Sequence, residues 1–333
     1  MLRIDEEKIF IEIERRRPKV VVFNAPSGLL SKTQDILMRV QEKYNIDAYL
    51  IADPCYGICD TFNHDAQRLN ADIIFHIGHT SSMDKIGDKT IIIDAYDDIS
   101  FNEVLQKAIP YLKGYSAIGL CTISQHLHKL NEVKHFLEDS GFKVLIGKGK
   151  GRLRDGQVLG CEFHTVYDIK DLVDVFLFLG QSSFHAIGVG LSTNKPIFML
   201  DPYFQEVINL QQIISEKMKK AILAIYKARD ANCLGIIIGL REGQMLLNKA
   251  IDLKKRLENL GKKVQLIALR EIINERLAEL QKVDAFIQTA CPRISIDGYT
   301  FNKPVLSIPQ AESLIQILMG GEFQDFLKKP SWL

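Results

Sequence analysis

The chain has 333 residues, enough for two or three domains, because a single hydrophobic core stops growing at about 250 to 300 residues. Hydrophobic residues make up 47% and charged residues 25%, a composition that excludes a disordered or fibrous protein. The formal net charge of +1 excludes a protein that binds nucleic acid through its whole surface, so we expect no nucleic-acid partner.

The first 17 residues mix acidic, basic and apolar side chains and contain no signal-peptide core. The longest apolar runs, at 175–179 and 234–240, fall far short of the roughly 20 residues that cross a bilayer. We therefore expect a cytoplasmic protein that does not insert into a membrane.

Continuous apolar runs, typical of strands covered by helices on both faces, recur along the chain. The first third has runs at 20–23, 48–51, 72–75 and 90–94, the second at 117–122, 143–146, 173–179 and 196–200, and the last at 234–238, 263–268, 285–288 and 304–308. Helical periodicity is clearest at 125–138 and 244–260. Each third therefore has the pattern of a β-α-β unit with four strands.

The repeat predicts the α/β fold class, with three similar domains at about residues 1–100, 101–205 and 206–333, each a small parallel sheet flanked by helices. Gly141 and Gly261 each separate a helical stretch from a strand that opens with lysine, where a left-handed helix cap is needed. No obvious amino-acid identity relates the three thirds, so the predicted repeat is one of architecture.

The six cysteines indicate metal or redox chemistry rather than a disulfide framework, because the cytoplasm keeps thiols reduced. Cys59, Cys161 and Cys291 each follow a predicted strand in a different third, and the three domains are expected to build one metal site there. Three thiolates suit zinc or an iron-sulfur cluster and leave a coordination position open for a substrate, which predicts an enzyme. Cys121 and Cys233 lie in or beside apolar runs and are expected to be packing residues.

Two of the three cysteine strings leave roles open. In D-P-C-Y-G-I-C-D, Cys55 is either a second ligand beside Cys59 or a buried neighbour of Pro54. The loop 147–156 before G-Q-V-L-G-C is rich in glycine, lysine and arginine. A solvated face is the plainer interpretation of these charges, and an acidic partner or a phosphate is the alternative.

In the third string, T-A-C-P-R-I-S-I-D-G, Pro292 stiffens the loop and Arg293 can pair with a carboxylate. The alternative is a plain surface turn.

Three further strings lie at strand ends. H-I-G-H places His76 and His79 where metal or acid-base chemistry is one interpretation and structural histidines are the favoured one. G-L-R-E-G-Q, at 239–244, offers amides to a ligand carboxylate or phosphate but matches neither the Walker nor the dinucleotide pattern. Phe184 and His185, in Q-S-S-F-H-A, are assigned no role.

Together, D-P-C-Y-G-I-C-D, G-Q-V-L-G-C, C-P-R-I-S-I-D and H-I-G-H resemble the archaeal diphthamide synthase family, 2-(3-amino-3-carboxypropyl)histidine synthases, over essentially the whole chain. The resemblance implies that Cys59, Cys161 and Cys291 hold a 4Fe-4S cluster at the centre of three α/β domains. The family's cysteine in the first domain follows a glycine and one further residue, here Gly57 and Ile58, which favours Cys59.

The same resemblance implies a transferase reaction. S-adenosylmethionine binds at the open iron, and one-electron reduction breaks the bond between sulfur and the methionine γ-carbon. The resulting 3-amino-3-carboxypropyl radical adds to a histidine of elongation factor 2, the first step of diphthamide biosynthesis. The usual radical enzymes carry C-x-x-x-C-x-x-C, whereas here Phe62 stands where the third cysteine of that loop belongs. The resemblance also implies a homodimer, an unidentified electron donor and no catalytic residue beyond the cluster.

His79, Gln244 and Arg293 are predicted to hold the methionine part of the substrate, because they lie near strand ends. The basic stretch 148–154 is predicted to border the face that admits the protein substrate. One rival is a quinolinate synthase-like 4Fe-4S enzyme, which fits poorly around Cys291. The other is a non-enzymatic three-domain ligand-binding module with buried cysteines, which a visible spectrum without cluster absorbance would reveal.

Overall fold

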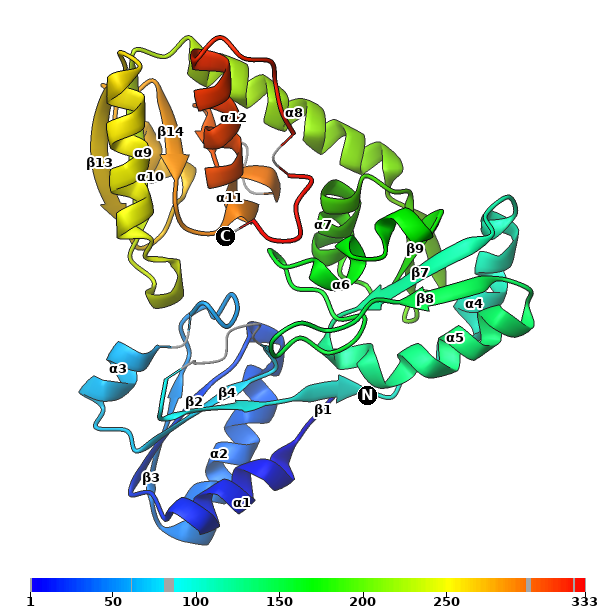
Figure 1. The fold of residues 1–333 in the computed structure, drawn as a ribbon. Coiled ribbons are helices and arrows are strands. Elements are labelled where there is room, and N and C mark those ends of the chain that lie inside the picture. Colours follow the sequence, from blue (N-terminus) through cyan, green and yellow to red (C-terminus); the bar gives the residue numbers. More distant parts are fainter. Residues whose placement is uncertain (1, 61, 81–86, 298–300, 326, 333) are drawn as a thin grey trace.

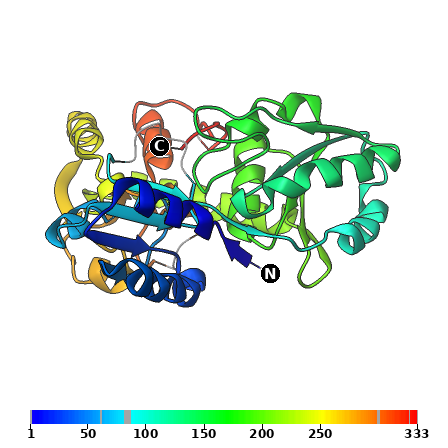
Figure 2. The same ribbon diagram turned by 90° about the horizontal axis from the view of Figure 1, so that it is seen from below.

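The computed structural model describes residues 2–60, 62–80, 87–297, 301–325 and 327–332. Figure 1 shows three lobes that follow one another along the chain, each built on a mostly parallel sheet with helices on its faces. In this view and in the view from below in Figure 2, the C-terminal end lies between lobes. Every strand predicted from the apolar runs is present, which confirms the α/β fold class.

The first sheet consists of parallel strands in the order β3-β2-β4-β5. Its strands are β2 Val20–Asn24, β3 Asp47–Ile51, β4 Ile73–Ile77 and β5 Thr90–Ile93, and its helices are α1 Glu6–Arg16, α2 Leu30–Tyr44 and α3 Asn63–Arg68. A short antiparallel pair, β1 Leu2–Ile4 with β6 Ala95–Asp97, joins the chain start to the residues after β5. The sequence did not predict this pair.

The second sheet has the order β8-β7-β9-β10-β11, and its last strand runs antiparallel to β10. Its strands are β7 Ala117–Thr122, β8 Lys143–Ile146, β9 Val175–Leu179, β10 Ile197–Asp201 and β11 Glu206–Asn209, and its helices are α4 Asn102–Ala108, α5 Leu130–Asp139, α6 His164–Tyr167 and α7 Ser183–Thr193. The extra strand β11 makes this unit larger than the four strands predicted for it.

The third sheet has the order β13-β12-β14-β15, again with parallel strands. Its strands are β12 Cys233–Gly239, β13 Lys263–Leu269, β14 Ala285–Gln288 and β15 Val305–Leu306, and its helices are α8 Gln211–Arg229, α9 Leu247–Asn259, α10 Asn274–Ala278, α11 Pro292–Asp297 and α12 Ile308–Leu318. None of the helices in the described part of the chain is both long and apolar enough to cross a membrane.

All three sheets share one strand order. In each, the first strand of the unit lies between the second and the third, and the fourth lies beyond the third. The strand order therefore reverses between β2 and β4, between β7 and β9, and between β12 and β14. In open α/β sheets, ligands bind beyond the carboxyl ends of the strands at such a reversal.

The three units also share a residue. Asp72, Asp174 and Asp284 each precede the third strand of their unit. Each carboxylate accepts two backbone N–H groups at 2.8 to 3.0 Å, from Lys19 and Val20, from Ser116 and Ala117, and from Asn232 and Cys233. These hydrogen bonds hold the pKa of all three carboxyls below the usual value. Besides their strand order, the three units therefore share an aspartate in the same structural position.

Helix α8 joins the second unit to the third. Ile214, near its start, packs into the core of the second unit, whereas Ile225, near its end, packs into the core of the third. The predicted boundary at 205 falls before β11, which belongs to the second sheet, so the second unit continues through Asn209. The division into three domains itself stays a prediction.

The helix caps agree with the sequence. Gly141 and Gly261 have φ angles of 92° and 82°, in the left-handed region that the predicted helix stops require. The helices α5 and α9 end two residues before these glycines, and one capping residue lies in between.

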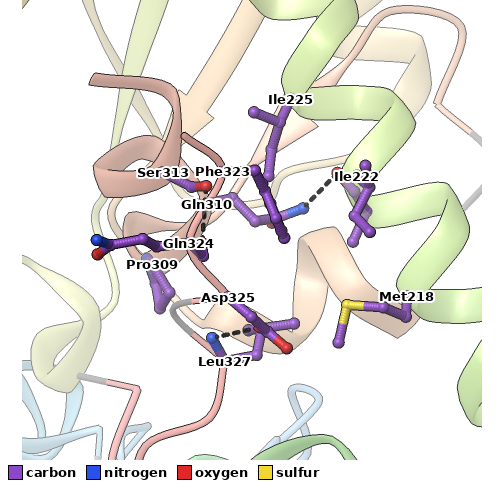
Figure 3. A pocket seen from close by; sticks show the side chains of 11 residues that line it. Met218, Ile222, Ile225, Pro309, Gln310, Ser313, Phe323, Gln324, Asp325 and Leu327 are labelled. Carbon is purple, nitrogen blue, oxygen red and sulfur yellow. Dashed lines mark hydrogen bonds between the residues drawn. The ribbon is translucent and has the colours of Figure 1, made fainter. Parts of the chain in front are cut away.

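The chain end packs first on α8 and α12 and then on the second unit. Figure 3 shows a narrow, mostly apolar hollow between these helices, where Ser313 Oγ donates to the backbone oxygen of Gln324 at 2.9 Å. Beyond it, the Trp332 indole Nε1 donates to the Leu327 carbonyl at 2.7 Å, and its ring lies 4.8 Å from that of Phe163. The last residues of the third unit therefore cover part of the second.

Candidate metal centre

The predicted ligand cysteines lie on loops of different units. Cys59 follows β3, Cys161 lies between β8 and α6, and Cys291 lies between β14 and α11. All three are partly exposed, whereas Cys55 and Cys121 are buried. Burial raises the pKa of Cys161, and negative charge on Cys291 or Cys59 raises it further. The three thiols therefore lie close enough to interact electrostatically.

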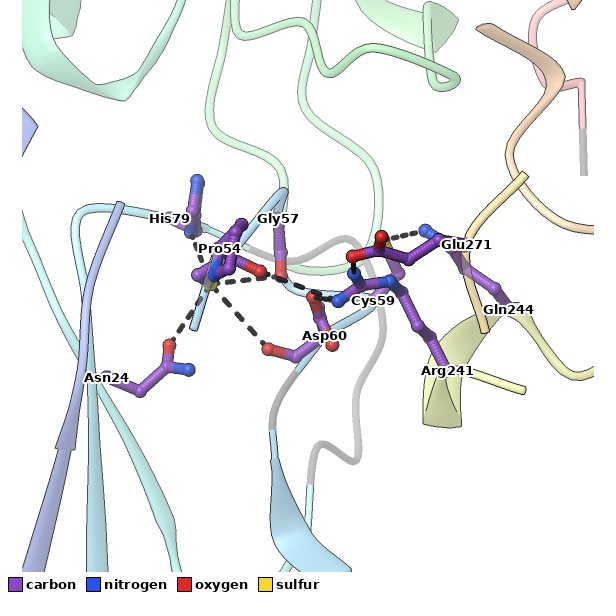
Figure 4. Close-up of polar contacts among 10 residues, drawn as sticks. Asn24, Pro54, Gly57, Cys59, Asp60, His79, Arg241, Gln244 and Glu271 are labelled. Carbon is purple, nitrogen blue, oxygen red and sulfur yellow. Dashed lines mark hydrogen bonds and ion pairs between the residues drawn. The ribbon is translucent and has the colours of Figure 1, made fainter. Parts of the chain in front are cut away.

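The loop after β12 holds the segment that carries Cys59. Arg241 forms an ion pair with the buried Asp60, and its Nη2 lies 3.2 Å from Glu271 Oε1. Gly243 N donates to the Cys59 carbonyl at 3.0 Å, and Gln244 Nε2 donates to Cys59 Sγ at 3.3 Å. In Figure 4, Arg241 and Gln244 of the loop after β12 lie beside Cys59 of the loop after β3.

Glu242 and Gly243 also belong to the contact between the loop after β12 and the segment that carries Cys59. The Glu242 carboxylate accepts the backbone N–H groups of Asn63 at 3.1 Å and His64 at 2.6 Å, at the start of α3. A Cβ atom on Gly243 would lie 2.7 Å from Cys59 Cα, so only glycine permits this approach. The predicted role of these amides in binding a ligand carboxylate or phosphate is wrong for Gly243, because its N–H is donated to Cys59.

Arg293 connects the loops of Cys161 and Cys291. Its guanidinium, with only 2% of the side chain exposed, pairs through Nε with Asp297, and its Nη2 donates to the Phe184 carbonyl. Its Nη1 lies 3.4 Å from the carbonyl of Gly160, the residue before Cys161. The guanidinium also lies 4.0 Å from the centre of the Phe184 ring. One buried cation therefore ties α11 to the second unit.

The chain end completes the enclosure of Cys161. Trp332 N donates to the Cys161 carbonyl at 3.1 Å, and Phe163 N donates to the Pro330 carbonyl at 2.7 Å. The backbone of Cys161 and Phe163 is therefore hydrogen-bonded to the last residues of the chain.

The donor set suits an iron-sulfur cluster. Burial raises the pKa of Cys291 to about 11 and also raises that of Cys59, where the hydrogen bond from Gln244 opposes it. The thiols therefore release their protons only to a cation that replaces them. Among the described residues, these three sulfurs do not form a group within 4.8 Å, the spacing expected for ligands of one ion. A cluster takes each thiolate on a different iron and fits this wider spacing.

The described contacts of the Cys55 side chain lie with residues of the first unit. Its thiol donates to Asn24 Oδ1 at 3.1 Å, and its sulfur lies 3.7 Å from His79 Nδ1. His76 Nε2 lies 3.2 Å from the same His79 nitrogen. Burial lowers the pKa of His76 to about 3 and that of His79 to about 4, so both imidazoles are neutral at neutral pH. Cys121 and Cys233 are packing residues, as predicted: Cys121 is buried in a core cluster, and Cys233, partly exposed at the start of β12, packs against another.

The basic stretch 148–154 is largely paired. Lys148 Nζ lies 2.7 Å from Asp155, and Arg154 Nη2 lies 3.3 Å from Asp94 of the first unit. The favoured interpretation of a solvated face agrees with the exposure of Lys148. Its predicted position beside an entrance for a protein substrate stays a prediction.

Several residues that support the site were not predicted from the sequence. Asp60, Arg241 and Glu242 were not singled out, although G-L-R-E-G-Q was predicted to offer backbone amides to a ligand. Trp332 received no mention, yet a lone tryptophan near the end of a chain is a signal of packing. Phe184 was assigned no role, although its carbonyl and ring both contact Arg293.

Comparison with known proteins gives one consistent result. The profile of a family described as "Putative diphthamide synthesis protein" matches residues 25–323. A protein of Pyrococcus horikoshii called 2-(3-amino-3-carboxypropyl)histidine synthase is 31% identical over 98% of this chain and 94% of its own length. One of the same name from Methanocaldococcus jannaschii is 28% identical over 98% and 91%.

The fold is similar to a solved one. The crystal structure of Dph2 from Pyrococcus horikoshii with a 4Fe-4S cluster superposes with a TM-score of 0.86, at 31% identity, over 99% of this chain and 96% of that one. The match spans all three sheets.

Proposed function

The chain belongs to the diphthamide synthesis protein family, and from that premise we propose that it transfers the 3-amino-3-carboxypropyl group of S-adenosylmethionine to a histidine of elongation factor 2. One observation carries the proposal. Loops of three different sheets bring Cys59, Cys161 and Cys291 within electrostatic reach of one another, in a chain that aligns end to end with 2-(3-amino-3-carboxypropyl)histidine synthases. This favours the transferase over a quinolinate synthase-like enzyme or a ligand-binding module.

The proposed reaction breaks the bond between sulfur and the methionine γ-carbon. It releases methylthioadenosine and a proton and forms a carbon-carbon bond to the acceptor imidazole. When held by the three cysteines, a 4Fe-4S cluster supplies a one-electron reductant and an open iron for the methionine part. We propose a radical route for this cleavage: one electron from an external donor starts it, and the imidazole adduct gives back one electron and releases the proton as it becomes aromatic again, so the overall reaction consumes no electron.

The protein's own part is to orient the ligands. Gln244 directs an N–H at Cys59 Sγ, while Arg241 and Glu242 hold the segment that follows this cysteine through the Asp60 side chain and the Asn63 N–H. Cysteine ligands held in one orientation keep the reacting atoms correctly positioned and limit competing reactions.

The structure supports the three predicted substrate contacts to different degrees. Gln244 reaches Cys59 and is well placed for the methionine part, and His79 lies beside the same loop. For Arg293, the described bonds go to Asp297, Gly160 and Phe184, which supports a positioning role instead. All three assignments remain proposals.

The homodimer is proposed from the family resemblance, and the cytoplasmic location from the sequence. Sedimentation of the purified chain tests the first.

Product analysis tests the function. Protein with a reconstituted cluster, incubated without oxygen with S-adenosylmethionine and dithionite, is expected to form methylthioadenosine. Added elongation factor 2 is expected to gain one 3-amino-3-carboxypropyl group, detected by mass spectrometry and located on one histidine by fragmentation. A factor with that histidine replaced serves as the control. 5′-Deoxyadenosine as the main product would refute the bond cleavage, and an unmodified factor despite cofactor turnover would refute the acceptor.

Replacement of Gln244 is expected to change the cluster without removing it. Gln244→Leu deletes the N–H donor to Cys59 Sγ, and because hydrogen bonds to cluster sulfurs raise the reduction potential, the potential should fall. A redox titration followed by visible absorbance measures the shift at unchanged iron content. Gln265→Leu, on the exposed face of β13, is the matched control. Equal potentials in both variants would contradict a role for this hydrogen bond.

A further inference from the structure

We propose that Cys55, His76 and His79 form a second metal site, separate from the predicted cluster, that binds one zinc ion. Their ligand atoms all lie within 4.8 Å of one another. His76 Nε2 and His79 Nδ1 are 3.2 Å apart, and Cys55 Sγ is 3.7 Å from His79 Nδ1.

The two distances to His79 Nδ1 are close to those of a tetrahedral zinc site. With bonds of about 2.3 Å to sulfur and about 2.0 Å to nitrogen, two nitrogen ligands lie about 3.3 Å apart, and a sulfur and a nitrogen about 3.5 Å apart. One thiolate and two neutral imidazoles are donors that zinc accepts readily. The thiol proton of Cys55 leaves to solvent when the ion binds.

The sheet topology places the three ligands together. His76 lies in β4 opposite Asn24 in the register of β2 and β4, and His79 follows the end of β4. The strand order of the first sheet reverses between these two strands, where α/β sheets bind ligands. Cys55 reaches the same place from the loop after β3.

Two buried polar atoms at this point have no partner among the described residues, His76 Nδ1 and Asn24 Nδ2. Asn24 turns its oxygen to Cys55 Sγ, and a half-turn of the amide would direct Nδ2 at the sulfur instead. A thiolate, as in a metal site, accepts from that donor far more strongly than a neutral thiol does. The orphaned amide is thus a second observation that points to a bound cation.

The site is distinct from the three cysteines of the candidate centre. Figure 4 shows His79 and Asn24 on one side of the loop and Cys59 with Gln244 on the other. Because Cys55 and Cys59 share this loop, a zinc ion at Cys55 would pin the segment that presents Cys59. Ligation through Nδ1 leaves Nε2 of His79 for the substrate contact proposed above. The inference does not depend on the proposed function.

Zinc binding by the full chain with its reconstituted cluster tests the site. The protein is equilibrated with buffered micromolar Zn²⁺, freed of unbound metal, and analysed for zinc and iron. We expect about one zinc beside about four irons per chain. Zinc K-edge absorption is expected to show one sulfur and two or three nitrogen or oxygen neighbours.

Variants decide whether these residues are the ligands. Cys55→Ser and His76→Ala should each weaken zinc binding by about tenfold or more, since even the loss of a ligand's partner costs about 10- to 100-fold. Circular dichroism verifies that each variant is folded. Cys121→Ser, a change at another buried cysteine, is the matched control and should keep its zinc.

Three results would overturn the site. One is wild-type protein without zinc under these conditions, which would leave a hydrogen-bonded network of neutral side chains. Another is a zinc shell of three sulfurs, which would place the ion at the other cysteines. The third is undiminished zinc in folded Cys55→Ser protein.

Discussion

Alanine in place of Cys59, Cys161 or Cys291 is expected to abolish the bound iron-sulfur cluster. Each thiol comes from a different sheet, so the loss of one leaves two ligands, too few to hold a cluster among three separate loops. We expect each variant, reconstituted without oxygen, to retain less than about a tenth of the wild-type iron and to lose the broad visible absorbance of the cluster.

The remaining cysteines provide the controls. Cys121→Ala and Cys233→Ala should bind iron as the wild type does, although Cys121 is fully buried and its replacement should cost about 1 kcal/mol of unfolding free energy. Iron, protein and acid-labile sulfide are measured on the same samples. A single variant at 59, 161 or 291 with full iron and full activity would remove that residue from the ligand set.

The strands were predictable because their burial leaves a continuous signal. β4, β9 and β14 are buried along their whole length, so their sequences are apolar without alternation, as expected where helices cover both faces. The short strands β1, β6 and β11 were missed because they lack such runs. Their pairing depends on partners far away in the sequence or on a reversal of direction that no local pattern encodes.

The residue-level repeat was present in the sequence and overlooked. Asp72, Asp174 and Asp284 each stand between a small apolar residue and the third strand of their unit. A lone acidic residue before an apolar run looks like an ordinary strand boundary. Only the structure shows that each carboxylate joins the starts of two neighbouring strands.

The three thiols of the candidate centre could be proposed from the sequence, whereas the residues that hold their loops could not. Cysteines at strand ends point to metal chemistry by residue type alone, whereas Arg293 and Gln244 were assigned to the substrate from position alone. In the structure both side chains contact another unit of the same protein, Gln244 at Cys59 and Arg293 at Phe184. Arg293 illustrates the limit, because a buried arginine and a substrate-binding arginine have the same sequence context until the carbonyls of Gly160 and Phe184 are located.

Replacement of Arg293 by methionine is expected to destabilise the fold and release the cluster. Burial lowers the pKa of Arg293, but Asp297 opposes this shift and the guanidinium stays charged. Without the guanidinium, the Asp297 carboxylate keeps Lys217 Nζ at 3.1 Å as its cationic partner. The carbonyls of Gly160 and Phe184 lose a hydrogen-bond donor. Breaking a buried pair costs about 3 to 5 kcal/mol, which urea unfolding measures.

A control at a more exposed ion pair distinguishes the effect of burial on stability from the effect of charge. Arg256 pairs with Glu312 at 2.6 Å with 37% of its side chain exposed, so Arg256→Met should cost no more than about 1 kcal/mol. Equal losses in the two variants would show that the burial of Arg293 contributes nothing special.

A second control separates positioning of the cysteine loops from general stability. Leu253→Ala empties a fully buried position in the core of the third unit and should cost about 2 to 5 kcal/mol, similar to the arginine variant. Under conditions where both proteins remain folded, we expect the leucine variant to keep its iron and Arg293→Met to lose it. The reason is that Arg293 alone of the two joins the backbone beside Cys161 to the helix that begins after Cys291. If both variants keep iron equally, Arg293 stabilises the fold without positioning the ligands, and the substrate contact predicted from the sequence becomes the better account of this residue.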